Sequence, residues 1–279
     1  MGVGEILDAA IKLYRSQWRR FMAIVAIALV PITFLQVFLT REISSPFAEP
    51  ATTSGEINSS VLVSVVLSLI EALVVQPFLV AAVAKASADV YLGHAVHVGP
   101  TFRFAVSKIH SILWITILLV LAIVVPSVVL VAIALQASEG LAIVVGLVLV
   151  VIAIVVFIRF LFGSTVLVVE GRKGSKALGR SWRLARGSFW KVFGTFLLAA
   201  ILSSIVQGIL SIPGGVAFAA IGPAGWPFYA IGVSLAAIVT TPFTTLITVL
   251  LYFDLRIRKE AFDLEVMARE LSAQEMSAR

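Results

Sequence analysis

One acidic residue, Glu71, lies within a long apolar stretch of this 279-residue sequence. It is near the middle of residues 61–84, and Gln76 and Pro77 follow it in the same stretch. An acid at the centre of a bilayer costs about 3 kcal/mol, so such a residue usually faces a cavity or a partner. Two roles remain open: a protonatable or cation-binding site with Gln76 beside it, or a neutral, hydrogen-bonded carboxyl group inside a helix bundle.

A second group of candidate residues is basic. Arg180, Arg183 and Arg186 recur at every third position, and three more basic residues precede them within a short segment. Anionic lipids attract each positive side chain near a membrane surface by about 1 kcal/mol. We therefore predict contacts with lipid headgroups or with a polyanionic partner. The six residues are Arg172, Lys173, Lys176, Arg180, Arg183 and Arg186.

Arg159 is a third candidate, near the end of the apolar stretch 141–161. Pairing with Glu71 requires that both side chains lie at the same depth in a membrane. We favour the alternative that the long side chain of Arg159 extends to the lipid headgroups, as is common near the ends of spans. Glu71, Gln76 and Arg159 are thus the candidate polar residues within the membrane.

Other kinds of chemistry find little support. The chain has no cysteine, which excludes disulfides, a thiolate nucleophile and cysteine-ligated metals. Asp89, His94 and His97 have a spacing that suits metal ligands. Because Gly93 interrupts a helix there and no fourth ligand is evident, we interpret these residues as part of a solvated loop. The sequence matches no catalytic motif, so we expect neither an enzyme nor a cofactor.

The composition defines the elements that must position these residues. The chain is 60% hydrophobic and 13% charged, with a mean hydropathy of +1.09. A soluble domain carries about 25% charged residues, so a soluble enzyme and a disordered chain are both excluded. About 20 apolar residues in a helix cross a bilayer, and lipid leaves no backbone group unpaired. We predict an all-α polytopic membrane protein in which residues 1–253 form one transmembrane domain. Its six spans are expected at about 21–39, 61–84, 111–135, 141–161, 192–212 and 228–252.

The distribution of Lys and Arg predicts the orientation of these spans. All but one of the 21 basic residues fall on one side, and only Arg41 lies on the other. Since loops rich in Lys and Arg stay in the cytoplasm, both termini are expected there, together with an amphipathic tail at 254–279. The same distribution accounts for the sequence pI near 9.9, so we expect no nucleic-acid binding.

Three basic, aromatic and amphipathic stretches each begin with Gly, end at Trp and precede an outward-going span. Helices of this kind lie in the plane of the headgroups. Two inward-going spans also share a spacing of 12 residues, from Pro77 to Asp89 and from Pro242 to Asp254. We predict three repeated units of an interfacial helix and two spans; the alternative is that six-span proteins commonly carry such flanks. The stretches are 4–18, 99–114 and 174–190.

Three segments of the sequence resemble the glycerophosphoryl diester phosphodiesterase membrane-domain family. They are GEILDAAIKLYRSQWRRFMAIVAIALVP, VVEGRKGSKALGRSWRLARGSFWKVFG and YFDLRIRKEAFDLE. The resemblance implies a stand-alone, actinobacterial-type membrane protein in a bacterial plasma membrane. In the family's namesake the chemistry belongs to a separate soluble barrel domain. This sequence has no such barrel, so the resemblance transfers no catalytic residue.

These features together predict a non-catalytic integral membrane protein. We expect a scaffold or accessory subunit that interacts with anionic lipids or with a partner protein on the cytoplasmic side. The alternative is a transporter or lipid-handling protein with an intramembrane site around Glu71.

Overall fold

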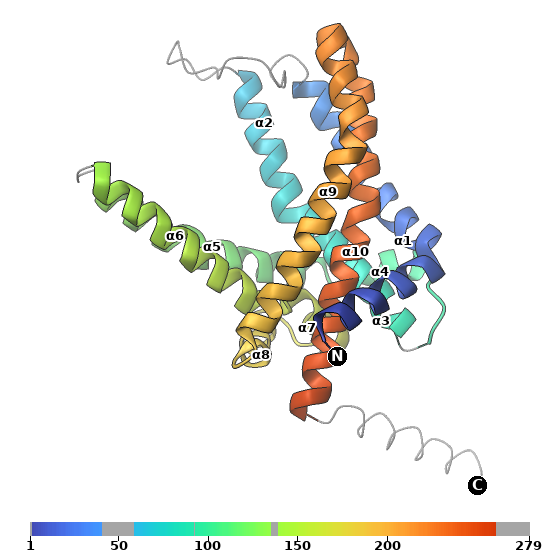
Figure 1. Ribbon diagram of the computed structural model, residues 1–279, viewed down its shortest axis with the longest axis vertical. Helices are drawn as coiled ribbons and strands as arrows, with labels where there is room; N and C mark the ends of the chain where they lie inside the picture. Colours follow the sequence, from blue (N-terminus) through green and yellow to red (C-terminus); the bar gives the residue numbers. More distant parts are fainter. Residues whose placement is uncertain (1, 41–58, 92, 135–138, 261–279) are drawn as a thin grey trace.

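The computed structural model describes residues 2–40, 59–91, 93–134 and 139–260 (Figure 1). Every element in this part of the chain is a helix, which confirms the all-α class. The elements are α1 (Val3–Thr40), α2 (Ser59–Ile70), a π-helical turn (Glu71–Val75), α3 (Gln76–Tyr91), α4 (Val98–Ser107), α5 (Ile109–Ala134), α6 (Glu139–Phe160), α7 (Gly163–Glu170), α8 (Ser175–Ala185), α9 (Phe189–Ile221), a 3-10 turn (Gly222–Gly225) and α10 (Trp226–Glu260).

Five described stretches are long and apolar enough to cross a membrane. Their outer surfaces carry many exposed apolar side chains; on α6, for example, Ile143 is 66% exposed and Leu147 is 64% exposed. A helix that is apolar all round is stable where protein or lipid surrounds it. The stretches are Val3–Leu39, Val65–Tyr91, Ile109–Val128, Ile143–Glu170 and Phe189–Glu260.

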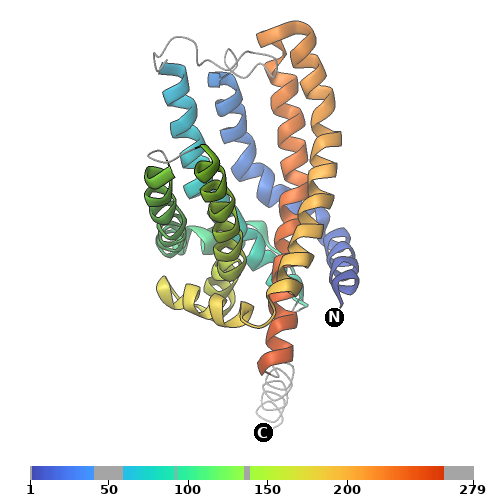
Figure 2. The ribbon, with the colours of Figure 1, turned by 60° about the vertical axis from the view of Figure 1, so that its left-hand side comes forward.

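The last stretch consists of α9, the turn Gly222–Gly225 and α10, which run side by side (Figures 1 and 2). Gly222 has a φ of +62°, a conformation that favours glycine and lets the chain reverse. Small residues bring the two helices together: a β-carbon on Gly214 would lie 2.5 Å from the carbonyl oxygen of Phe228. Close backbone contact through glycine is typical of helix pairs in membranes.

Short helices precede α5 and α9, and a break within α1 separates its first turns from the rest. Gln17 has a non-helical backbone, with φ −132° and ψ 23°. The other two breaks fall at Lys108 and between α8 and α9. The short helices α4 and α8 therefore end before the interfacial stretches expected at 99–114 and 174–190 do. Trp114 and Trp190 belong instead to the long helices α5 and α9. Figure 1 shows the first turns of α1 crossing the direction of the long helices.

The interior is concentrated where α3 packs against α7 and α10 and where α1 packs along α10, whereas α5 and α6 lean to one side as a pair (Figure 1). Residues 245–255 of α10 are all buried. The ring of Tyr91 on α3 stacks on Phe253 of α10, with the ring centroids 4.4 Å apart. Phe162, at the break between α6 and α7, is fully buried next to Tyr252. This aromatic packing joins α3 and the start of α7 to the last turns of α10.

The first seven residues of the expected tail, 254–260, are helical and continue α10 without a break through Glu260. The side chain of Arg258 reaches back one turn to Asp254, with 3.2 Å between Nε and Oδ1, which supports the extra helical turns. Residues 261–279, the remainder of the tail, lie outside the described residues.

Gly214→Ala is expected to destabilise the pairing of α9 with α10, because the new methyl group meets backbone atoms that cannot rotate away. Overpacking of this kind costs about 1–3 kcal/mol. We expect a lower midpoint of thermal unfolding for the purified protein in detergent, measured by the monodisperse fraction that remains after heating.

Gly208→Ala is the matched control, since it lies on the same helix and a β-carbon there meets nothing within 4 Å. It should leave the midpoint unchanged or raise it slightly. Equal losses of stability in both variants would contradict a close approach of the two helices at Gly214.

Candidate functional site

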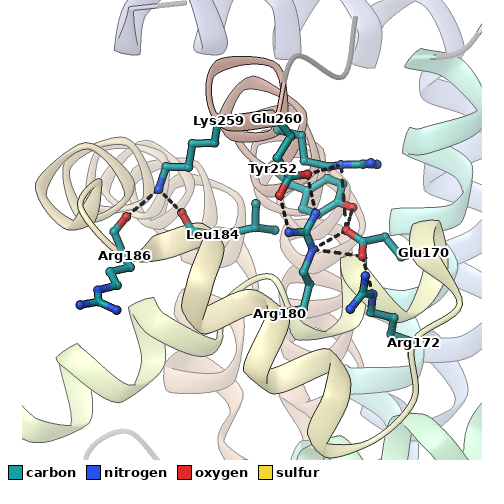
Figure 3. Close-up of polar contacts among 9 residues, drawn as sticks. Glu170, Arg172, Arg180, Leu184, Arg186, Tyr252, Lys259 and Glu260 are labelled. Atoms are coloured by element: carbon teal, nitrogen blue, oxygen red, sulfur yellow. Dashed lines mark hydrogen bonds and ion pairs between the residues drawn. The ribbon is translucent and has the colours of Figure 1, made fainter. Parts of the chain in front are cut away.

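Paired charges join α7, α8 and α10 at one end of the helices (Figure 3). Glu170, the last residue of α7, has a side chain only 11% exposed. Arg180 of α8 donates from Nε to both of its carboxylate oxygens, at 2.9 and 3.1 Å. The two terminal nitrogens of Arg180 bind the carboxylate of Glu260 on α10. A planar guanidinium suits such two-sided pairing better than an ammonium group would.

Three further residues complete this arrangement. The Tyr252 hydroxyl donates to Glu170 Oε1 at 2.8 Å, and Arg256 Nε lies 3.4 Å from Glu260 Oε2. Arg172 Nε lies 2.9 Å from Glu170 Oε2. We call this set the charge cluster: Glu170, Arg172, Arg180, Tyr252, Arg256 and Glu260.

Arg180 stays cationic in the charge cluster. Its hydrogen bond to Glu260 is the main cause of a pKa raised above the ordinary value for arginine, and Glu170 acts in the same direction. Its side chain is 13% exposed, so solvent contributes little to balancing its charge. The cluster therefore joins three helices through ion pairs in which Glu170, Arg180 and Arg256 are poorly reached by water.

Lys259 of α10 binds the C-terminal end of α8. Its ammonium group donates to the carbonyl oxygens of Leu184 and Arg186, at 2.7 and 2.6 Å (Figure 3). The carbonyls of a last helical turn lack partners within the helix, and a lysine there also interacts favourably with the helix dipole. Along its middle, α8 is bonded to α6, since the Ser181 hydroxyl donates to the Arg159 carbonyl at 2.8 Å.

A paired acidic residue lies within the last two turns of each of three helices, α3, α7 and α10. Asp89 of α3 pairs with Lys85 one turn earlier. Asp254 of α10 is 3% exposed and pairs with Lys191 of α9. Glu170 is the corresponding residue of α7. The Pro-Phe spacing singled out Asp89 and Asp254, whereas Glu170 was missed; its position directly before the helix-ending Gly171, which has a φ of +69°, was the available signal.

The six predicted basic residues have different surroundings. Arg180 points into the charge cluster, and Arg172 is half-exposed and pairs with Glu170. Lipid or partner contact by the rest stays a prediction. These four are exposed: Lys173, Lys176, Arg183 and Arg186.

The structure brings Glu71 and Gln76 together. Glu71 opens the π-helical turn, and Gln76 Nε2 lies 3.5 Å from its Oε1. The backbone N–H of Gln76 bonds the carbonyl of Glu71, five residues back. The next residue, Pro77, has no N–H for the helix ladder, which favours a local widening at this point. Such turns are frequent at functional sites.

Arg159 is not part of that pair. It lies on the last turn of α6, and its guanidinium carbon is 4.9 Å from the ring centre of Trp182 on α8. Its Nε and Nη1 are buried and have no hydrogen-bond partner among the described residues. Within the described part of the chain, no ion pair joins Arg159 to Glu71. The structure therefore divides the predicted intramembrane site into two separate places.

Among the residues that the structure describes, no three His, Cys, Asp or Glu side chains could share a metal ion. Asp89 is engaged with Lys85, while His94 and His97 are exposed in the segment before α4.

The helices and their paired charges define a class: an all-helical protein with several helices long and apolar enough to cross a membrane. Residues 1–255 match the family described as Domain of unknown function (DUF7847), and the chain belongs to this family. No curated protein and no solved structure matches the chain. The family description names no activity, ligand or partner.

Arg180→Met is expected to destabilise the protein, because it leaves Glu170 and Glu260 close together without their shared cation. Breaking a largely buried ion pair from one side costs about 3 kcal/mol. We expect the midpoint of thermal unfolding in detergent to fall by several degrees.

Arg183→Met removes an exposed cation from the same helix and serves as the control. A surface substitution of this kind changes stability by less than about 0.5 kcal/mol. If both variants unfolded at the wild-type temperature, the charge cluster would have no role in holding α8.

Proposed function

We propose that this protein is a non-catalytic integral membrane protein of the bacterial plasma membrane, a scaffold or accessory subunit. The observation that carries the proposal is the division of charge around α8. Arg180 is bound between two carboxylates, whereas Lys176 and Arg183 on the same helix are exposed. One face of the helix is used to hold it in place, and the other offers cations to anionic lipids or to an acidic partner protein.

Six crossings are the proposed topology. The stretch Phe189–Glu260 reverses at Gly222–Gly225, which supports counting it as two spans. The other candidate stretches contribute four. The proposed orientation places the charge cluster and both termini in the cytoplasm, since the basic residues concentrate at that end.

A threefold repeat is part of the same proposal. Short helices precede α5 and α9, and the first turns of α1 precede a break in the same way. The paired acids Asp89, Glu170 and Asp254 support three units, because each lies within the last two turns of its helix, α3, α7 or α10. Units that each cross twice share one orientation, as in parallel transporter repeats.

We base the proposed absence of catalysis on the hydrogen bonds and ion pairs in which the acidic residues already take part. Glu170 accepts hydrogen bonds from Tyr252 and Arg180, and Asp254 is held by Lys191 and Arg258. A general base needs a free lone pair directed at a substrate. Carboxylates with several donors around them suit structural pairing instead.

A relationship to the glycerophosphoryl diester phosphodiesterase membrane-domain family is likewise a proposal. The segment at 168–194 that resembles this family covers the end of α7, all of α8 and the start of α9. These elements carry part of the charge cluster and four exposed cations, so this one of the three resembling segments coincides with a strongly basic part of the chain.

The second candidate function is transport or lipid handling through a site around Glu71. One observation favours it: Glu71 lies at a π-helical turn within a candidate span, with Gln76 beside it. Such a turn can direct a polar side chain toward a path between helices.

Cysteine labelling tests the topology, because the chain has no cysteine of its own. Ala224→Cys lies in the turn between α9 and α10, and Ser107→Cys lies at the end of α4. In intact spheroplasts a membrane-impermeant maleimide should label the first and not the second, while both should react after lysis. Labelling of Ser107→Cys in intact spheroplasts would contradict the proposed orientation, and protection of both sites until lysis would contradict two crossings by α9 and α10.

Native mass spectrometry of protein extracted with its own lipid tests the function. We expect a retained anionic lipid or a stoichiometric partner protein that is lost when the four exposed cations are changed to Gln, since each contributes about 1 kcal/mol of attraction. Glu71→Gln should leave retention unchanged. The opposite result, retention lost with Glu71→Gln alone, would favour the intramembrane site over the scaffold. The four positions are Lys173, Lys176, Arg183 and Arg186.

A further inference from the structure

A groove lies between the first turns of α5 and the loop that joins α7 to α8. Its volume is about 720 Å³, and its lining carries Arg172, Lys173 and Lys176 on one side and His110 on the other. None of the lining residues is acidic, although Glu170 pairs with Arg172 from beside the groove. The groove is thus a concave surface with a net positive charge.

Backbone groups add to this charge. The helix α8 begins at Ser175 on the wall of the groove, and no side chain caps its N-terminus. The first N–H groups of a helix have no partner within the helix, and the dipole favours negative charge there. Combined with two exposed lysines, this geometry suits phosphate oxygens.

The shape of the groove depends on Gly174. This residue has a φ of +54°, and a β-carbon there would lie 2.9 Å from Cδ1 of Trp114. The loop therefore packs directly on the indole ring, which forms the floor next to the cations. A residue with a side chain at this position would displace Trp114 and change the groove without changing its charge.

The position of the groove favours a lipid over a soluble anion. It lies at the beginning of the candidate span Ile109–Val128, which is the level of the headgroups. From Trp114, a row of exposed apolar side chains continues along α5 at helical spacing. A lipid with its phosphate in the groove can lay its acyl chains along this row. The row consists of Trp114, Ile117, Leu121, Val124, Val125 and Val128.

We propose that this groove binds the headgroup of a membrane lipid that carries a phosphomonoester. A phosphomonoester has a charge of about −1.5 to −2 near pH 7, compared with −1 for a phosphodiester. Two exposed lysines, an arginine and an open helix N-terminus match the larger charge. The inference rests on the proposed function and deepens it, since it names the lipid class and the place where that lipid binds.

The test uses the full chain in phosphatidylcholine nanodiscs that contain a small fraction of either phosphatidic acid or phosphatidylglycerol, with bound lipid counted by native mass spectrometry. The K173Q/K176Q variant should retain at least tenfold less phosphatidic acid than the wild type, because both lysines line the groove and can bind the phosphate directly. The matched control, R183Q/R186Q, removes the same charge from the other end of α8 and should lower retention less than about threefold, because neither arginine lines the groove.

A charge-neutral variant, G174A, separates shape from electrostatics. It should also lower retention of phosphatidic acid, with thermal unfolding used to confirm that the protein remains folded. Inorganic phosphate should not displace the lipid at equal concentration.

Three results would overturn the proposal. Equal losses of retained lipid in the two double variants would mean diffuse attraction. That result would exclude the groove as the binding site but leave the scaffold function intact. Equal retention of phosphatidylglycerol would remove the preference for a phosphomonoester. Displacement by inorganic phosphate would make the occupant a soluble anion. If the wild type retained neither phosphatidic acid nor phosphatidylglycerol, that result would count against the proposed function itself.

Discussion

Arg180 lies between two carboxylates that are 10 and 80 residues away along the chain. The packing of α7, α8 and α10 at this end of the protein depends on this pairing. Glu170 ends α7, Glu260 lies on the last turn of α10, and α8 is held across both. Charges in poorly solvated surroundings are stable only when each is compensated, so none of the three can be replaced alone without cost to the others.

The two ends of the long helices are stabilised by different means. At the turn between α9 and α10, glycines allow backbone contact and no charge is involved. At the other end, paired acids and bases join helices that are distant in sequence. Lipid around a helix pair offers no hydrophobic drive for association and leaves packing to small residues.

The contrast between the largely buried Arg180 and its exposed basic neighbours affects how substitutions in residues 172–186 are to be interpreted. A change at Arg180 alters the position of α8 as well as the charge of the surface, so a lost phenotype there does not report on lipid binding. Lys173, Lys176, Arg183 and Arg186 are exposed and carry no such structural role in the described contacts. They are the positions at which surface charge is varied without moving the helix.

The sequence by itself determined the helical membrane class, since hydropathy over 20-residue stretches reflects the thickness of a bilayer rather than any tertiary contact. It also indicated Asp89 and Asp254 through a repeated spacing. Only the tertiary structure decided which of the arginines on α8 faces inward. Side chains three positions apart on a helix differ in direction by about 60°, so Arg180 and Arg183 point in different directions from α8, and Arg186 lies just beyond its end. The inward position is chosen by partners on α7 and α10, whose proximity no local pattern encodes.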